Sequence, residues 1–390
     1  MKVVFVSNFY NHHQKPFADE LYAQLGDGYR FIETEKIHEE RLNMGWGTEE
    51  KPPYVLQNYT DSEAKESCQK IIDEADAVII GSAPRSLLNT RLKNKKLTFY
   101  YSERPYKIMP PFYKRFVHLL RNTKNIIRHR NLYILCASAY TSADYAKVLT
   151  FWGKAYQWGY FPALKNYDNI DSLINRKNPG SILWVARFID WKHPEHAVEI
   201  AKRLKKDGYE FRLSMIGSGE LEDFIRESVK EENLSDCVEM LGTMKPEQVR
   251  QHMENSEIFL FTSDRNEGWG AVLNESMNSA CAVVANSAIG SVPFLMRHAE
   301  NGYMYEDGNL DDLYEKVKKL LDDTQERKRL AKNANKTLTE EWNAENAAKK
   351  FLVLCERLLH GEYKIFPFQS GVLSKATVLH DNWFKTRKGM

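Results

Sequence analysis

Two glutamates with a glycine-containing segment between them are the strongest candidates for chemistry in this sequence. Glu267 and Glu275 lie eight positions apart in Glu267-Gly-Trp-Gly-Ala-Val-Leu-Asn-Glu275, after an apolar run over 259–263 that is typical of a strand. A helical pattern begins near Ala271, and glycine together with free amides at the start of a helix suits a diphosphate. Since carboxylates do not bind phosphate, we expect each glutamate to accept hydrogen bonds from sugar hydroxyls. The alternative is a glutamate that favours the helix dipole and a solvated loop glutamate.

Two cations follow another predicted strand. The strand ends at Arg187, Lys192 comes five residues later, and Pro194 is a favoured first residue of a helix. The planar fork of arginine and the point charge of lysine both suit phosphate oxygens. An ion-paired Arg187 and a solvated Lys192 would be the alternative.

Two weaker signals lie in the same half of the chain. Gly217 belongs to Gly217-Ser-Gly219, again between a strand and a helix. Thr243 and Met244 follow the strand predicted over 238–241, where the backbone could pair with the edge of a nucleobase. A structural turn explains both patterns equally well.

The first half offers polar residues at strand ends. Asn11, His12 and His13 follow the first predicted strand, and Glu103 with Arg104 follows the strand predicted over 97–101. We take Glu103 as the acceptor-side carboxylate, and either histidine could orient an acceptor hydroxyl or contact phosphate. A surface histidine pair and a Glu103–Arg104 salt bridge remain alternatives.

Short apolar runs alternate with helical patterns through both halves of the chain. That pattern predicts parallel strands covered on both faces, hence two doubly wound, Rossmann-like α/β domains with a cleft between them. We assign 1–165 and the tail from about 366 to 390 to a first, acceptor-side domain, and 166–365 to a donor-binding domain, with a linker over 163–180. Residues 36–60 read as a long loop. The expected strands are 3–7, 31–33, 77–81, 97–101, 133–137, 181–185, 212–216, 238–241, 258–262 and 282–286.

Composition limits the classes of protein that are possible. The 390 residues suit two domains, and no apolar run reaches the roughly 20 residues that cross a bilayer. Five scattered cysteines show no metal or redox spacing, so we expect free thiols, no bound metal and a cytoplasmic location. The net charge is +2, yet residues 104–143 carry eight Lys or Arg and no acid, which leaves −6 (2 − 8) for the rest.

Taken in order, these motifs resemble the retaining GT-B glycosyltransferases of family 4. The resemblance rests on Arg187 and Lys192, Gly217-Ser-Gly219, Gly242-Thr-Met-Lys-Pro-Glu247 and the E-x7-E of Glu267 and Glu275. It covers about residues 181–309, whereas the first half is similar only in its architecture.

The resemblance implies a role for each matching residue. Arg187 and Lys192 would hold the diphosphate of a UDP- or GDP-type sugar donor, Glu275 the ribose hydroxyls, and Glu267 the transferred hexose. The amides of Trp269, Gly270 and Ala271 would line the phosphate side, with no metal required. The implied function is the retaining transfer of a sugar to a glycan or lipid-linked acceptor, in polysaccharide or glycoconjugate biosynthesis.

The sequence also departs from the family pattern. Residues 8–14 replace a common Gly-Gly turn, Phe294 stands where a glutamate is usual, and Glu103 lies where a catalytic histidine is common. These departures leave room for a non-catalytic nucleotide-sugar-binding subunit. A GT-B nucleotide-sugar epimerase is the other alternative.

The basic stretch predicts a partner. Residues 106–130 combine cations with Phe, Tyr and Leu, the composition of a helix at a membrane interface. We therefore hypothesise a peripheral contact with an anionic leaflet on the inner face of the membrane; the alternative is an ordinary helix with a basic solvent side. No nucleic-acid-binding motif accompanies the charge, so nucleic acid is not an expected partner.

Overall fold

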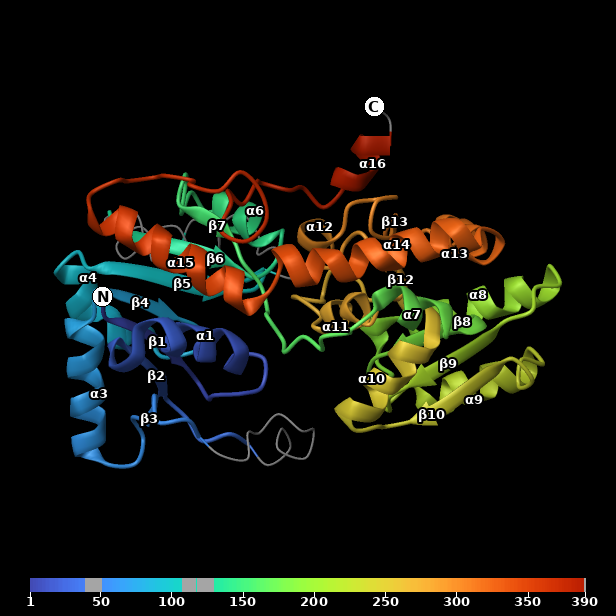
Figure 1. Cartoon of the computed structure of the whole chain (residues 1–390), viewed down its shortest axis with the longest axis horizontal. Coiled ribbons are helices and arrows are strands. Elements are labelled where there is room, and N and C mark those ends of the chain that lie inside the picture. Colours follow the sequence, from blue (N-terminus) through green and yellow to red (C-terminus); the bar gives the residue numbers. More distant parts are fainter. Residues whose placement is uncertain (39–50, 107–116, 118–129, 389–390) are drawn as a thin grey trace. The chain divides into compact units, whose positions relative to one another are not determined.

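The computed structural model describes residues 1–38, 51–106, 117 and 130–388, which form two compact units (Figure 1). The first unit consists of Met1–Ala163 and Trp342–His380, and the second of Leu164–Glu341 and Asp381–Met390. None of the described helices is long and apolar enough to cross a membrane. The five cysteines are free, as expected.

The first unit contains a seven-stranded parallel sheet in the order β3-β2-β1-β4-β5-β6-β7. Because β1 lies between β2 and β4, the strand order reverses at β1, where α/β sheets usually bind ligands. The strands are β1 (Val3–Ser7), β2 (Tyr29–Glu33), β3 (Val55–Gln57), β4 (Ala77–Ile80), β5 (Leu97–Ser102), β6 (Leu132–Cys136) and β7 (Ala155–Gln157). The helices include α1 (Lys15–Leu25), α3 (Ser62–Glu74), α4 (Asn89–Lys93), α6 (Thr141–Ala146) and α15 (Ala344–Leu359).

The second unit contains a six-stranded parallel sheet in the order β10-β9-β8-β11-β12-β13. Its strands are β8 (Asn178–Val185), β9 (Arg212–Ile216), β10 (Val238–Gly242), β11 (Ser256–Phe261), β12 (Ala282–Asn286) and β13 (Tyr303–Tyr305). Its helices include α7 (Ile170–Asn175), α8 (Pro194–Lys206), α9 (Glu222–Glu231), α10 (Pro246–Asn255), α11 (Val272–Asn278), α12 (Val292–Leu295), α13 (Leu310–Asp322), α14 (Thr324–Lys336) and α16 (Trp383–Lys388).

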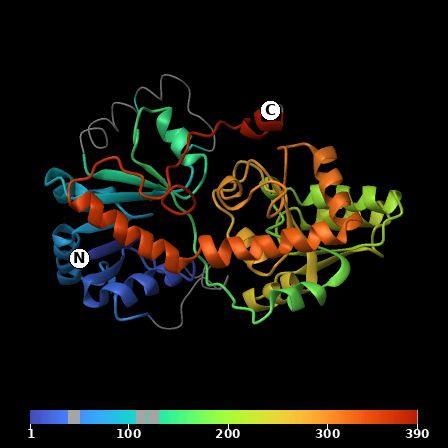
Figure 2. The same cartoon turned by 45° about the horizontal axis from the view of Figure 1, so that its top comes forward.

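Helices cover both faces of the second sheet. All five residues of β12 are buried, which a strand achieves only when both faces of its sheet are covered. In the second unit α8 packs on α9 and α13, whereas α14 packs on α7 and α11 (Figures 1 and 2). The prediction of two doubly wound, Rossmann-like domains is therefore confirmed.

Helix α15 belongs to the first unit, so the prediction that residues 166–365 form the second domain is wrong for this helix. Its Phe351 is fully buried, with its ring centroid 5.0 Å from that of Phe99 and 6.2 Å from that of Phe17. Conversely, Phe384 in the C-terminal tail packs its ring 5.4 Å from His298 of the second unit. The packing of these aromatic side chains determines which unit each segment belongs to. The order of the segments along the chain does not indicate this packing.

Other differences concern short elements. The expected linker over 163–180 contains helix α7, and β8 already begins at Asn178. Within the expected loop over 36–60, residues 55–57 form the edge strand β3. The edge strands β7 and β13 were also missed, because three residues are too short to show a period.

Candidate functional site

An ion pair at the carboxyl end of the second sheet joins two predicted site residues. Lys192 follows β8 and Glu267 follows the neighbouring strand β11, so both side chains reach the same edge of the sheet. The Lys192 ammonium group is ion-paired with the Glu267 carboxylate, and the two side chains are only 12% and 10% exposed. The Ser263 hydroxyl donates a further hydrogen bond of 3.0 Å to the same carboxylate oxygen.

Arg187 lies in the same loop, against an aromatic ring. The Lys192 nitrogen is 4.3 Å and the Arg187 guanidinium carbon 6.0 Å from the ring centroid of Trp191. The Thr262 hydroxyl donates a 2.7 Å hydrogen bond to the carbonyl oxygen of Lys192, which ties this loop to the end of β11. Two cations and one carboxylate therefore converge at this strand end.

Gly270 lets the backbone pass closely behind Glu267. Its φ is +80°, and a Cβ atom there would lie 2.3 Å from the Phe261 ring and 3.2 Å from Cγ of Glu267. The Trp269 side chain is 1% exposed and donates a 2.9 Å hydrogen bond to Asn274, so it belongs to the core. Ala271 precedes α11 as its N-cap, in helical conformation.

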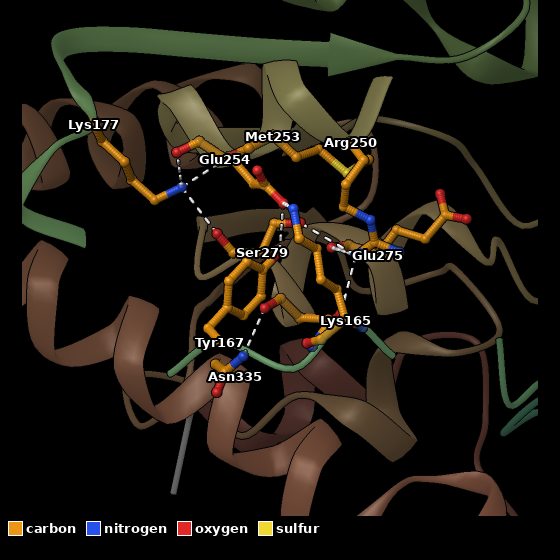
Figure 3. A network of polar contacts seen from close by, with 10 residues as sticks. Lys165, Tyr167, Lys177, Arg250, Met253, Glu254, Glu275, Ser279 and Asn335 are labelled. Atoms are coloured by element: carbon orange, nitrogen blue, oxygen red, sulfur yellow. Dashed lines mark hydrogen bonds and ion pairs between the residues drawn. The ribbon is translucent and has the colours of Figure 1, made fainter. Parts of the chain in front are cut away.

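A polar network behind α11 fixes the helix that carries Glu275 (Figure 3). Arg250 donates to the Glu275 carbonyl oxygen at 3.2 Å, and the buried Lys177 ammonium donates to the Ser279 carbonyl oxygen at 2.9 Å. Lys177 also donates to carbonyl oxygens of Met253, Glu254 and Ser256, which holds the C-terminal ends of α10 and α11 together. In Figure 3 the Glu275 side chain points away from this network.

The Glu275 carboxyl group has an electrostatic environment of its own. Burial raises its pKa, and the charge of Arg250 opposes that shift. Glu275 helps to line a hollow of about 340 Å³, together with Lys165, Pro246 and Arg250. Among the described residues no hydrogen bond or ion pair joins the carboxylate of Glu275 to Lys192 or Glu267.

Gly217 is required by packing. A Cβ atom there would lie 1.9 Å from the Ala186 carbonyl oxygen, at a φ of +137°. The end of β9 therefore approaches the loop that carries Arg187. Thr243 is exposed and its hydroxyl donates to the Ser218 hydroxyl at 2.9 Å, while Met244 is partly buried.

His193 and its neighbours form a polar group that the sequence motifs do not indicate. His193 adopts φ +50° at the N-cap of α8, and hydrogen bonds to Asp264 and Glu195 raise its pKa to about 10. The ligand atoms of His193, Glu195 and His196 lie within 4.8 Å of one another, so this group could hold a metal ion once His193 loses its proton. The only sequence signal is the adjacency of these residues to Lys192.

The first unit has a cavity of about 530 Å³ where the strand order reverses. It lies beyond the carboxyl ends of β1, β4 and β5, and four predicted acceptor-side residues line it: Asn11, His13, Glu103 and Arg104. His12 is adjacent to the cavity rather than part of its lining, with its ring centroid 3.8 Å from that of His13. Burial, reinforced by the neighbouring His12, lowers the pKa of His13 to about 3, so its imidazole is neutral at pH 7.

Glu103 and Arg104 have different environments. Glu103 accepts a 2.5 Å hydrogen bond from the Tyr160 hydroxyl, and both residues line the cavity. The Arg104 side chain is 2% exposed and ion-paired at 3.1 Å with the fully buried Asp144. The described partners of Arg104 are thus structural, and its guanidinium also lies 4.8 Å from the Tyr140 ring centroid.

Arg85 is a cavity residue that the sequence did not indicate. It is exposed, lines the same cavity, and lies 5.0 Å from the Tyr100 ring centroid. No acidic side chain in the described part of the chain forms an ion pair with it. The predicted membrane-binding stretch 106–130 lies almost entirely outside the described residues.

Comparison with known proteins identifies the second unit. Residues 167–337 match the family described as glycosyl transferases group 1. This part of the chain is a group 1 glycosyltransferase domain. It contains Lys192, Glu267 and Glu275, and its limits nearly coincide with those of the second unit.

Relatives of this glycosyltransferase domain match over part of their length. The amylovoran biosynthesis glycosyltransferase AmsK of Erwinia amylovora is 30% identical over 140 residues, 35% of this chain and 34% of AmsK. An N-acetylgalactosaminyltransferase of Campylobacter jejuni, named for a diphospho-undecaprenol-linked acceptor, is 32% identical over 156 residues, 40% of this chain and 41% of that protein. The chain thus spans about a third to a half of the curated relatives it matches.

Solved structures resemble this chain over most of its length. HepE of Anabaena in complex with UDP has a TM-score of 0.66 at 14% identity, covering 91% of this chain and 100% of HepE. Sucrose-phosphate synthase of Thermosynechococcus elongatus has a TM-score of 0.62 at 15% identity, covering 93% of this chain and 100% of that protein. These similarities confirm the GT-B fold.

Proposed function

We propose that this protein is a retaining glycosyltransferase that moves a sugar from a UDP- or GDP-type nucleotide-diphosphate sugar to a glycan or lipid-linked acceptor. The observation that carries the proposal is the buried ion pair of Lys192 and Glu267 beside Arg187. A donor needs cations for its diphosphate and an oxygen acceptor for its sugar hydroxyls. This cluster offers both at a strand end of a group 1 glycosyltransferase domain.

The cluster is suited to leaving-group stabilisation. In the proposed complex the Lys192 ammonium turns from Glu267 to the diphosphate, and the released carboxylate accepts a hydrogen bond from a hexose hydroxyl. The Glu275 carboxylate accepts hydrogen bonds from the ribose hydroxyls. As the bond between the anomeric carbon and the phosphate oxygen breaks, charge grows on the diphosphate, and Arg187 and Lys192 stabilise it. No metal is needed for this step.

The acceptor side is assigned to the cavity of the first unit. The Glu103 carboxylate and the neutral imidazole of His13 can each accept a hydrogen bond from an acceptor hydroxyl. The hydroxyl oxygen forms the new bond to the anomeric carbon on the face that the phosphate leaves, and its proton passes to a nearby base. The environment of Arg104 favours a supporting role for that residue.

The names of similar proteins support the substrate classes. HepE was solved with UDP, and the Campylobacter jejuni relative is named for a lipid-diphosphate acceptor. AmsK of Erwinia amylovora is named for the biosynthesis of the polysaccharide amylovoran. WcaL of Escherichia coli is named for the biosynthesis of colanic acid. We accordingly propose a role in polysaccharide or glycoconjugate biosynthesis, on the cytoplasmic side of a membrane.

The test measures release of nucleoside diphosphate from a panel of UDP- and GDP-sugars by the purified chain. We expect Lys192→Ala and Glu275→Ala each to reduce turnover about 100-fold or more, because each removes a group that contacts the donor. Lys206→Ala, at an exposed lysine that ends α8, is the matched control and should keep full activity. If both site variants turn over like the control, the donor-site assignment fails.

Further outcomes separate the alternatives. Donor binding by thermal shift without any release of nucleoside diphosphate would favour a non-catalytic subunit. Release of an isomerised nucleotide sugar would favour an epimerase. Retention would be read from the anomeric configuration of the product by NMR, and an inverted product would overturn that part of the proposal.

A further inference from the structure

The first unit has an apolar hollow with exposed hydrophobic side chains beside it. Its volume is about 500 Å³, and most of its lining is apolar, including Ala146, Phe151, Trp152, Ala155, Phe366 and Val378. Trp152 is 66% exposed, Leu149 53% and Val378 50%. Contiguous apolar surface that is exposed to water is a feature of sites that bind a protein or a membrane.

The loop that presents Trp152 is fixed by its neighbours. Leu149 and Phe151 adopt φ of +55° and +57°, a left-handed conformation that costs a side-chain-bearing residue about 1–2 kcal/mol. Phe151 is buried, and its ring packs edge-on against Tyr145 at 5.2 Å and Tyr100 at 6.1 Å. The packing of Phe151 holds the loop so that Trp152, the next residue, lies outside the core.

Cations lie on the same side of the first unit as this hollow. The side chain of Lys364 lies 3.5 Å from the position a Cβ atom would take at Gly153, and Lys375 lies 5.6 Å from the ring centroid of Phe366. Burial lowers the pKa of Lys154 to about 8, and the positive charges of Lys364 and Arg130 add to the shift. Among the described residues, no acidic side chain forms an ion pair with Arg130, Lys364 or Lys375.

We propose that this surface, the Trp152 face, docks on an anionic lipid bilayer. We define it by the exposed apolar residues Leu149, Trp152 and Val378 and the cations Arg130, Lys154, Lys364 and Lys375. Tryptophan favours the boundary between water and acyl chains, and lysine stems pack on apolar surface while the ammonium groups stay in water. Positive side chains beside an apolar centre match a leaflet with anionic head groups.

Docking would bring the acceptor cavity to the membrane. Helix α6 separates the two hollows, since its Tyr145 lines the polar cavity that contains Glu103 while its Ser142 and Ala146 line the apolar one. A helix is about 10 Å across, so Glu103 would lie close to the head groups. This consequence rests on the proposed function, whereas docking itself does not. A lipid-linked acceptor could then enter the cavity without leaving its leaflet.

The test is co-sedimentation of the full chain, without donor, with phosphatidylcholine vesicles that contain or lack phosphatidylglycerol. We expect binding to the anionic vesicles, and a loss of about tenfold in affinity for Trp152→Ala, because its exposed ring supplies the buried apolar area. Lys364→Gln and Lys375→Gln should each weaken that binding about fivefold. Phe224→Ala, at a residue 60% exposed in the second unit, is the matched control and should bind like the wild type.

Three results would overturn the proposal. They are equal affinity for both kinds of vesicle, wild-type binding by Trp152→Ala, and a Trp152-dependent dimer in sedimentation velocity without lipid. Because Trp152 is mostly exposed, its variant should unfold at nearly the wild-type temperature, and that measurement separates lost docking from lost folding. Release of nucleoside diphosphate without vesicles should also be unchanged, so failure of docking and failure of the proposed transferase are distinguishable.

Discussion

Replacing Lys192 with methionine would leave the Glu267 carboxylate buried without its cation. Removing one partner of a buried ion pair costs about 3–5 kcal/mol, because the remaining charge loses its compensation. Both side chains here keep roughly a tenth of their exposure, and Ser263 still donates to the carboxylate, so we expect the lower end of that range. A loss of about 3 kcal/mol in a unit of this size lowers the midpoint of thermal unfolding by about 6–12 °C.

The second variant in this experiment is Lys192→Met combined with Glu267→Gln. The amide has no net charge, and Ser263 can still hydrogen-bond to it, so about 2 kcal/mol of the lost stability should return. Calorimetry and urea unfolding of the wild type and both variants measure the difference. Binding of a nucleoside diphosphate should stay weak in both variants, since neither has the ammonium group.

A particular result would refute this reasoning. If the double variant were no more stable than Lys192→Met alone, the uncompensated carboxylate could not be the source of the instability. If Lys192→Met alone unfolded at the wild-type temperature, the pair would contribute nothing to the fold. The comparison of the two variants therefore separates the structural role of the pair from its role in donor binding.

Two further predictions concern backbone packing and pH. Gly217→Ala should cost about 3 kcal/mol or more in urea unfolding, because its Cβ atom would meet the Ala186 carbonyl oxygen at 1.9 Å. Gly208→Ala, with φ +79° and no atom within 4 Å, should cost only about 1 kcal/mol, and equal losses would contradict the packing role. His13 has a folded pKa of about 3, so the unfolded chain binds its proton first as pH falls below about 6.5. As the pH is lowered between these values, the free energy of unfolding should therefore decrease by up to about 1.4 kcal/mol per pH unit. His13→Gln should remove this contribution to the pH dependence.

Strands buried on both faces could be predicted from the sequence, and three-residue edge strands could not. The expected strands 3–7 and 282–286 coincide with β1 and β12, because a fully buried parallel strand appears as an unbroken apolar run. In contrast β3, β7 and β13 each have three residues and lie at sheet edges, where one neighbour suffices to form the strand. Such a segment leaves no period to detect.

The site could be predicted where it follows from strand order alone. Lys192 and Glu267 follow strands that proved to be neighbours, and side chains at adjacent carboxyl ends come together. Arg104 also follows a strand, but its partner Asp144 lies 40 residues further along the chain. Arg85 has no motif around it, and only the folded sheet brings it to the cavity that contains Glu103.

The assignment of α15 to the first unit has a consequence for synthesis on the ribosome. Residues 164–341 form one continuous segment of the second unit, whereas the first unit also needs residues 342–380. The N-terminal part emerges from the ribosome first. Because Phe351 of α15 is fully buried in its core, that part exposes aromatic surface until α15 has been made. All of the second unit except residues 381–390 can therefore become compact before the first unit is complete, and an N-terminal fragment ending at residue 163 would be prone to aggregate. A chaperone that binds the emerging N-terminal half until residue 380 has been translated would therefore benefit this protein. A protein in which each domain is one continuous segment would need such a chaperone less.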